Sequence, residues 1–78
     1  MTLNSAHLRA VGLTLYGPAW QAPLAEALGI AERSIRRWAA GKPVPAGVWP
    51  ELSVICREKQ KALSELIAYL ETATLKED

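Results

Sequence analysis

The chain has 78 residues and a net charge of +1, half of its residues are apolar, and Cys56 is its single cysteine. A chain of this length buries about 60% of the surface that it exposes when unfolded, which excludes a deep catalytic cleft between two lobes. One cysteine excludes an internal disulfide. No stretch has the ~20 apolar residues of a membrane span, and none has the pattern of a signal peptide. We therefore expect one folded, soluble domain in the cytoplasm.

Charge is distributed unevenly along the chain. Residues 1–42 contain five basic and two acidic residues, a balance of +3, whereas residues 43–78 contain four basic and six acidic residues, a balance of −2. Such asymmetry points to an anionic partner at the basic half. A solvated surface explains the same pattern equally well, so the charge alone does not decide between them.

Glycine and proline residues divide the chain into helical segments, and the scarcity of β-branched residues disfavours strands. Four segments with helical periodicity cover about residues 5–16, 21–28, 32–40 and 48–74. Asn4 or Ser5 is placed to cap the first segment, in which Gly12 is a weak position. Pro23 is tolerated in the second segment because a proline in the first turn of a helix removes no hydrogen bond.

The last segment carries an apolar stripe at helical spacing, interrupted at Lys59. It forms either one long helix or two helices with a kink near residues 58–61. The preceding helices can cover the first half of the stripe, but the part from Leu63 to Leu70 has fewer partners within the chain, so we expect it to pair two chains. Trp49 either fastens this segment to the third helix or lies at a contact between subunits. The stripe consists of Leu52, Ile55, Cys56, Leu63, Leu66, Ile67 and Leu70.

Residues 21–41 combine two short helices with a connecting turn that contains a glycine, which is the helix-turn-helix arrangement. Ala25 lies where the two helices cross, and a larger side chain there would push them apart. Gly29 can adopt the left-handed conformation that the turn requires. Ile30 and Ile35 are expected to fill the wedge between the helices.

One face of the third helix stays free of these apolar contacts and is basic. Trp38 is expected to anchor the opposite face to the core. The free face suits the DNA major groove, which admits an α-helix and displays a distinct pattern of donors and acceptors for each base pair. Arginine binds guanine through two hydrogen bonds, and glutamate accepts one from cytosine. The face carries Glu32, Arg33, Arg36 and Arg37.

The segment resembles the Cro/CI-type (Xre-like) helix-turn-helix family of regulators over residues 8–57, with its specific part at residues 21–41. The matching positions are Gln21, Leu24, Ala25, Leu28, Gly29, Ile30, Ser34, Ile35, Trp38 and Gly41. The resemblance implies a lambda-repressor-like fold. It implies that bases are contacted by Glu32, Arg33 and Arg37, and phosphates by Gln21, Ser34, Arg36 and Lys42.

Three positions depart from the family pattern. Ala31 replaces the usual Ser or Thr cap of the recognition helix, and losing such a cap costs about 1 kcal/mol. Trp20 stands where a small polar cap is common, and Ala39 replaces a frequent glutamate. These departures leave the docking geometry possible.

The sequence predicts an all-α domain of four or five helices, with a helix-turn-helix unit in residues 1–57 and a helical extension of the same domain in residues 58–78. We expect a sequence-specific regulator of transcription that binds duplex DNA as a homodimer near the nucleoid, as a phage-type or autoregulatory repressor. The alternative is a protein-interaction module, antitoxin-like or an adaptor, whose C-terminal helix binds a partner. His7 and Cys56 have no companions at metal-ligand spacing, and no catalytic constellation is visible. We therefore expect no enzyme activity, metal, cofactor or small-molecule ligand.

Overall fold

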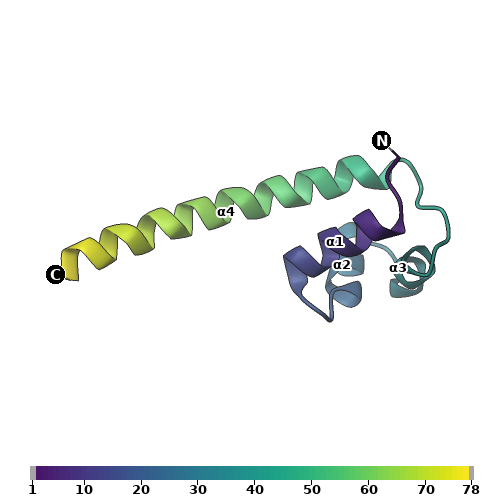
Figure 1. Ribbon diagram of the computed structural model, residues 1–78, viewed down its shortest axis with the longest axis horizontal. Coiled ribbons are helices and arrows are strands. Elements are labelled where there is room, and N and C mark those ends of the chain that lie inside the picture. The colour runs from purple at the N-terminus through teal and green to yellow at the C-terminus, as the bar shows by residue number, and fades with distance from the viewer. Residues whose placement is uncertain (1, 78) are drawn as a thin grey trace.

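The computed structural model describes residues 2–77, and the part of the chain that it describes contains four helices and no strand. The helices are α1 (Ser5–Tyr16), α2 (Gln21–Leu28), α3 (Glu32–Ala39) and α4 (Val48–Glu77). The predicted all-α class is therefore confirmed. The three short helices form a compact unit, and α4 begins on this unit and then projects away from it (Figure 1), so that the molecule measures 53 × 25 × 20 Å.

The side chain of Asn4 caps α1. Its Oδ1 atom accepts a hydrogen bond from the Ala6 N–H at 2.9 Å. It also accepts one from the His7 N–H at 3.4 Å, while Nδ1 of His7 accepts one from the Asn4 N–H at 3.1 Å. This reciprocal pair is a capping box, in which the side chain of the third helical residue serves the backbone of the cap. Of the two candidate residues, Asn4 is therefore the cap of α1. The hydroxyl of Ser5 has a hydrogen-bond partner outside this helix.

The turn between α2 and α3 has the backbone geometry expected from its glycine. Gly29 has a φ of +70°, in the left-handed region. The Ile30 N–H donates to the Ala25 carbonyl at 3.0 Å, which gives the Schellman ending of a helix. α3 ends at Ala39, one residue earlier than predicted, and Gly41 follows with a φ of +113°.

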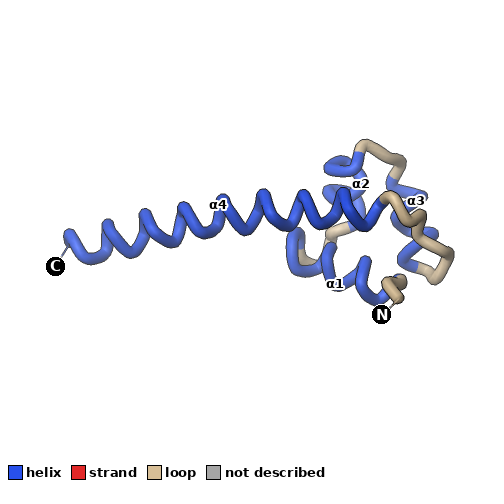
Figure 2. Tube along the Cα trace, turned by 90° about the horizontal axis from the view of Figure 1, so that it is seen from above, coloured by secondary structure: helices blue, strands red, loops and turns tan. Residues whose placement is uncertain are grey.

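The core lies between the short helices and the first turns of α4. α1 packs against each of the other three helices, and α2 packs against α3. Figure 2 shows the first turns of α4 over the short helices and the remainder extending clear of them. The buried hydrophobic side chains are Leu8, Trp20, Leu24, Ala25, Ile35 and Leu52.

Gly12 is a poor helix former within α1, but the packing requires a glycine there. Gly12 is buried, and a Cβ atom at this position would overlap the indole ring of Trp20. Trp20 is only 4% exposed and makes no side-chain hydrogen bond as the cap of α2. The chain therefore has a large core side chain where a polar cap is common, and the missing side chain of Gly12 makes room for it.

α4 is one continuous helix from Val48 to Glu77, so the alternative of two helices is wrong. Lys59, which interrupts the apolar stripe, extends its Nζ atom to 5.7 Å from the centroid of the Tyr16 ring. This distance is typical of a cation–π contact, which ties α4 to the end of α1. Within the described residues, no helix has both the length and the apolar character needed to cross a membrane.

Candidate nucleic-acid interface

α3 is fixed to the core by one face. Ile35 is fully buried, and the half-buried side chains of Trp38 and Ala39 pack against the core. At the start of the helix, Ala31 has an extended backbone and supplies no side-chain hydrogen bond, so the predicted lack of a cap is confirmed. The orientation of α3 therefore depends on its packing and on contacts at its C-terminal end.

The opposite face of α3 is exposed and basic. Arg33, Arg36 and Arg37 are exposed, whereas Glu32 is half-buried. Nη2 of Arg36 lies 2.6 Å from Oε2 of Glu32, and Nε of Arg36 donates to the same oxygen at 3.1 Å. Glu32 and Arg36 thus satisfy each other in the free chain. Among the side chains of residues 2–75 this is the one ion pair, and it leaves Arg33 and Arg37 exposed without an acidic partner.

The remaining predicted contacts lie on three different segments. Ser34 is half-buried within α3, and Gln21 is the half-buried first residue of α2. Lys42 is exposed in the loop after α3, where its backbone N–H donates to the Arg37 carbonyl at 3.1 Å. The structure therefore places the Lys42 cation after the C-terminal end of the helix that carries the three exposed arginines.

Two residues of α1 hold the C-terminal end of α3, a role that the sequence did not predict for either. The Ser5 hydroxyl donates to the Trp38 carbonyl at 2.7 Å, and Nη2 of Arg9 donates to the Ala39 carbonyl at 2.9 Å. The last carbonyls of a helix have no partner within it, so α1 supplies these partners. The four-residue spacing of Ser5 and Arg9, which puts both on one face of α1, was the only signal in the sequence.

The segment that leads into α4 closes the core beside α3. Val44, Val48 and Trp49 are half-buried and pack against the core cluster, which favours the interpretation that Trp49 fastens α4 to this unit. Beyond Cys56 the character of α4 changes. Its large apolar side chains become exposed, with Leu63 58% and Leu70 53% accessible to solvent.

Comparison with known proteins gives no match: no family model, no curated protein and no solved structure is similar to the chain. Nor does the described part of the chain bring together three or more His, Cys, Asp or Glu side chains as a metal site would require.

Proposed function

We propose that the chain binds duplex DNA sequence-specifically with α3 in the major groove, and that it acts as a regulator of transcription. The observation that carries this proposal is the division of α3 into two faces. Ile35 is fully buried, while Arg33 and Arg37 on the opposite face are exposed and have no acidic partner. A helix that is fixed by one side and basic on the other can enter the groove without rearrangement of the core.

The free face of α3 belongs to a single helix, which is the element that the major groove admits. The major groove is about 12 Å wide and accepts one α-helix. An arginine that forms two hydrogen bonds with guanine contributes about 1–3 kcal/mol of discrimination against other bases. In this proposal Arg33 and Arg37 contact bases, and Glu32 contacts a base by exchanging its bond with Arg36.

Contacts with phosphates surround the base contacts. In the same proposal Gln21, Ser34 and Lys42 meet phosphates at the edges of α3, and Arg36 joins them when Glu32 turns to a base. Phosphate contacts fix the register of a protein on the duplex but carry no sequence information. Exposed Lys42 is suited to this role, because its backbone is bound to the end of α3 while its side chain lies in solvent.

The proposal includes a homodimer formed through α4. Two helix-turn-helix units in one particle can bind two half-sites, which suits a repressor of the phage type or one that controls its own gene. The exposed apolar side chains of α4 also favour the second candidate function, a protein-interaction module whose α4 binds a different protein. In that case the basic face of α3 is a solvated surface.

The test begins with selection of bound duplexes from a random library, followed by affinity measurements on the selected duplex. We expect Arg33→Ala and Arg37→Ala each to weaken binding by about 10- to 100-fold and to relax the preference at one base pair. Arg36→Ala should weaken binding to all sequences alike and lower the slope of log affinity against log salt by about 1.

The matched control is Lys61→Ala, which also removes one positive charge but lies on the exposed part of α4. Measured at concentrations at which both proteins are dimers, it should leave the affinity for the selected duplex within about twofold, since exposed charges far from a duplex are screened at physiological salt. Equal affinity and sequence preference in the wild type and the Arg33→Ala/Arg37→Ala double variant would overturn the proposal.

A further inference from the structure

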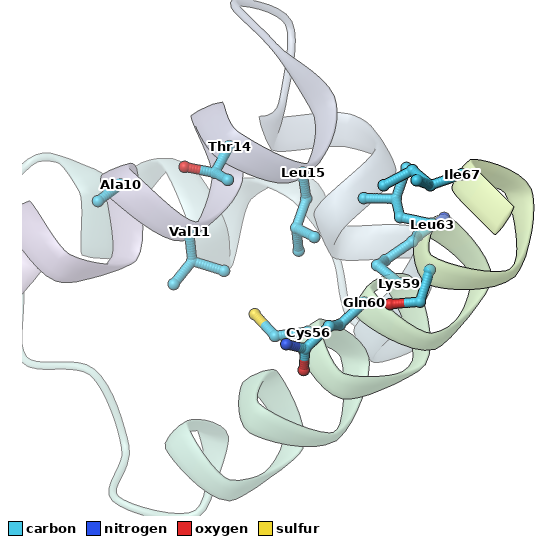
Figure 3. A pocket seen from close by; sticks show the side chains of 10 residues that line it. Ala10, Val11, Thr14, Leu15, Cys56, Lys59, Gln60, Leu63 and Ile67 are labelled. Carbon is cyan, nitrogen blue, oxygen red and sulfur yellow. The ribbon is translucent and has the colours of Figure 1, made fainter. Parts of the chain in front are cut away.

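An apolar groove runs between α1 and the middle of α4. It has a volume of about 650 Å³ and is lined by Val11, Thr14 and Leu15 from α1 and by Cys56, Leu63 and Ile67 from α4. Figure 3 shows the side chains of the two helices directed toward the space between them. None of these six side chains belongs to the buried core.

α4 supplies one wall of this groove. It also carries an exposed apolar ridge, of which Leu63 and Ile67 line the groove as well. The ridge consists of Leu63, Leu66, Ile67 and Leu70. The wall residues continue along the same side of the helix at alternating spacings of four and three, which is the seam of a helix that packs on another helix. Leu66 lies beside the seam. It is on the side of α4 from which the side chain of Lys59 reaches α1. The seam consists of Cys56, Gln60, Leu63, Ile67, Leu70 and Thr74.

The ridge is long enough to occupy a groove of this kind. Leu63, Leu66, Ile67 and Leu70 are each more than half exposed in the single chain. Residues 63–74 span about 17 Å at the rise of an α-helix. The C-terminal part of α4 extends away from α1 (Figure 1), so it cannot fold back into the groove of its own chain.

The charges of α4 determine how two copies can pair. Residues 57–61 contain three basic residues and one acidic residue, whereas residues 62–75 contain Glu65 and Glu71 and no basic residue. Parallel pairing in register places like charges side by side, whereas antiparallel pairing places the basic segment beside the acidic one. Like charges repel and opposite charges attract across a helix pair, so α4 is complementary to itself in the antiparallel orientation.

We infer, building on the homodimer of the proposed function, that the groove binds the C-terminal half of α4 from a second copy of this chain, in antiparallel orientation. With the pair centred near Glu65, Cys56 lies beside Thr74 of the second copy and Leu63 beside its Ile67. Arg57 then lies near Glu71 of the second copy. The contact is isologous, because each chain offers the same groove and the same ridge, and it produces a bundle of two α1 and two α4 helices.

Disulfide trapping tests the orientation with the full chain. Cys56 and residue 74 are about 27 Å apart along one helix, so a bond between them can form only between chains. We expect Thr74→Cys to give a covalent dimer under mild oxidation, and Ala62→Cys, an exposed matched control, to give none at the same concentration. A covalent dimer from Cys56→Ser/Thr74→Cys, which only parallel helices allow, would overturn the inference.

Charge exchange tests the same orientation without a covalent bond. Arg57→Glu should weaken the dimer by about tenfold, which corresponds to about 1.4 kcal/mol, since it replaces two weak attractions between exposed charges by two repulsions. Adding Glu71→Arg to the same chain should restore the wild-type dissociation constant. Residues 57 and 71 lie about 21 Å apart on one helix, so the rescue cannot arise within a chain. An unrescued double variant would contradict the antiparallel pairing.

Sedimentation of α1 variants tests the groove itself. Thr14 and Leu13 are both exposed, but only Thr14 lines the groove. We expect Thr14→Asp to weaken the dimer by tenfold or more and Leu13→Asp to leave it unchanged, with helical content constant in both. A wild-type chain that stays monomeric at all concentrations overturns the inference and leaves α4 to another partner. If that monomer still binds the selected duplex, the proposed DNA binding stands although the dimer fails. A chain that forms the dimer but binds no duplex would instead overturn the proposed DNA binding and leave the dimer standing.

Discussion

The small size of Gly12 and the large size of Trp20 depend on each other, because the two residues share one space in the core. The indole ring of Trp20 occupies the space above the backbone of Gly12, where any Cβ atom would overlap it. Trp20 is nearly fully buried and is the largest side chain in the core. A substitution at Gly12 therefore forces the ring out of its place or moves α1 away from α2.

Gly12→Ala should lower the free energy of unfolding by about 1–3 kcal/mol, because overpacking outweighs the better helix propensity of alanine. Urea unfolding of the variant measures the change. Gly47→Ala is the matched control, since nothing lies within 4 Å of a Cβ atom at that position. In a Trp20→Leu background the penalty of Gly12→Ala should shrink, and equal penalties in both backgrounds would contradict a direct overlap.

The absent cap at the start of α3 leads to a second prediction at this scale. Ala31 has the extended backbone of a capping residue, with φ −69° and ψ 140°, but offers no side-chain acceptor. Ala31→Ser should raise the free energy of unfolding by about 1 kcal/mol, because the hydroxyl can accept a hydrogen bond from the first turn. Ala40→Ser, at the exposed other end of the helix, should have no such effect, and equal stability of the two variants would contradict the prediction.

At the scale of helices, α1 acts as the support of α3. Ser5 and Arg9 donate to the Trp38 and Ala39 carbonyls, while Leu8 between them is fully buried. The same face of α1 therefore fills the core and holds the end of the helix proposed to enter DNA. A displacement of α1 would change the angle at which α3 meets a duplex.

Ser5→Ala should cost about 1 kcal/mol of stability, which is the net contribution of one neutral hydrogen bond. It should also weaken binding to the selected duplex, since the end of α3 loses its support. Thermal unfolding and duplex affinity are measured on the same samples. Ser53→Ala, on an exposed turn of α4, serves as the control, and a Ser5→Ala variant indistinguishable from it would show that the bond does not support α3.

Local signals in the sequence predicted most of the helix boundaries, but they did not predict the contacts between helices. Pro23 and Gly29 limit α2 because their backbone preferences act within a few residues. The pairs Gly12–Trp20 and Tyr16–Lys59 join residues from different helices. The periodicity of one helix shows which face is buried, but it does not specify the side chain that meets this face. The pairing of Glu32 with Arg36 lies within α3 and was missed although their four-residue spacing permits it.

At the scale of the whole molecule, α4 divides the chain into a packed unit and a projecting helix. The core residues all lie between Leu8 and Leu52, whereas the large apolar side chains from Leu63 onward are exposed. An isolated helix of fewer than ~15 residues is marginal in water. The projecting part of α4 is therefore expected to gain most of its stability from the proposed pairing with a second copy.

The melting temperature should consequently depend on protein concentration. For unfolding coupled to dissociation we expect a rise of about 4 °C for each tenfold increase in concentration. Leu70→Asp, which introduces a charge on the exposed ridge, should remove this dependence without changing the packed unit. Calorimetry over a hundredfold range of concentration makes the comparison. A wild-type melting temperature constant over that range would exclude stabilisation by self-association.

The projecting half of α4 also affects how long the chain survives. Proteases cleave segments that open locally, and a helix without tertiary contacts opens more readily than a packed one. A dilute chain therefore exposes a cleavable tail, whereas the proposed pairing of two copies would shield that tail at high concentration. Newly made protein would be degraded quickly until enough had accumulated to pair, so that the lifetime of the protein rises with its abundance.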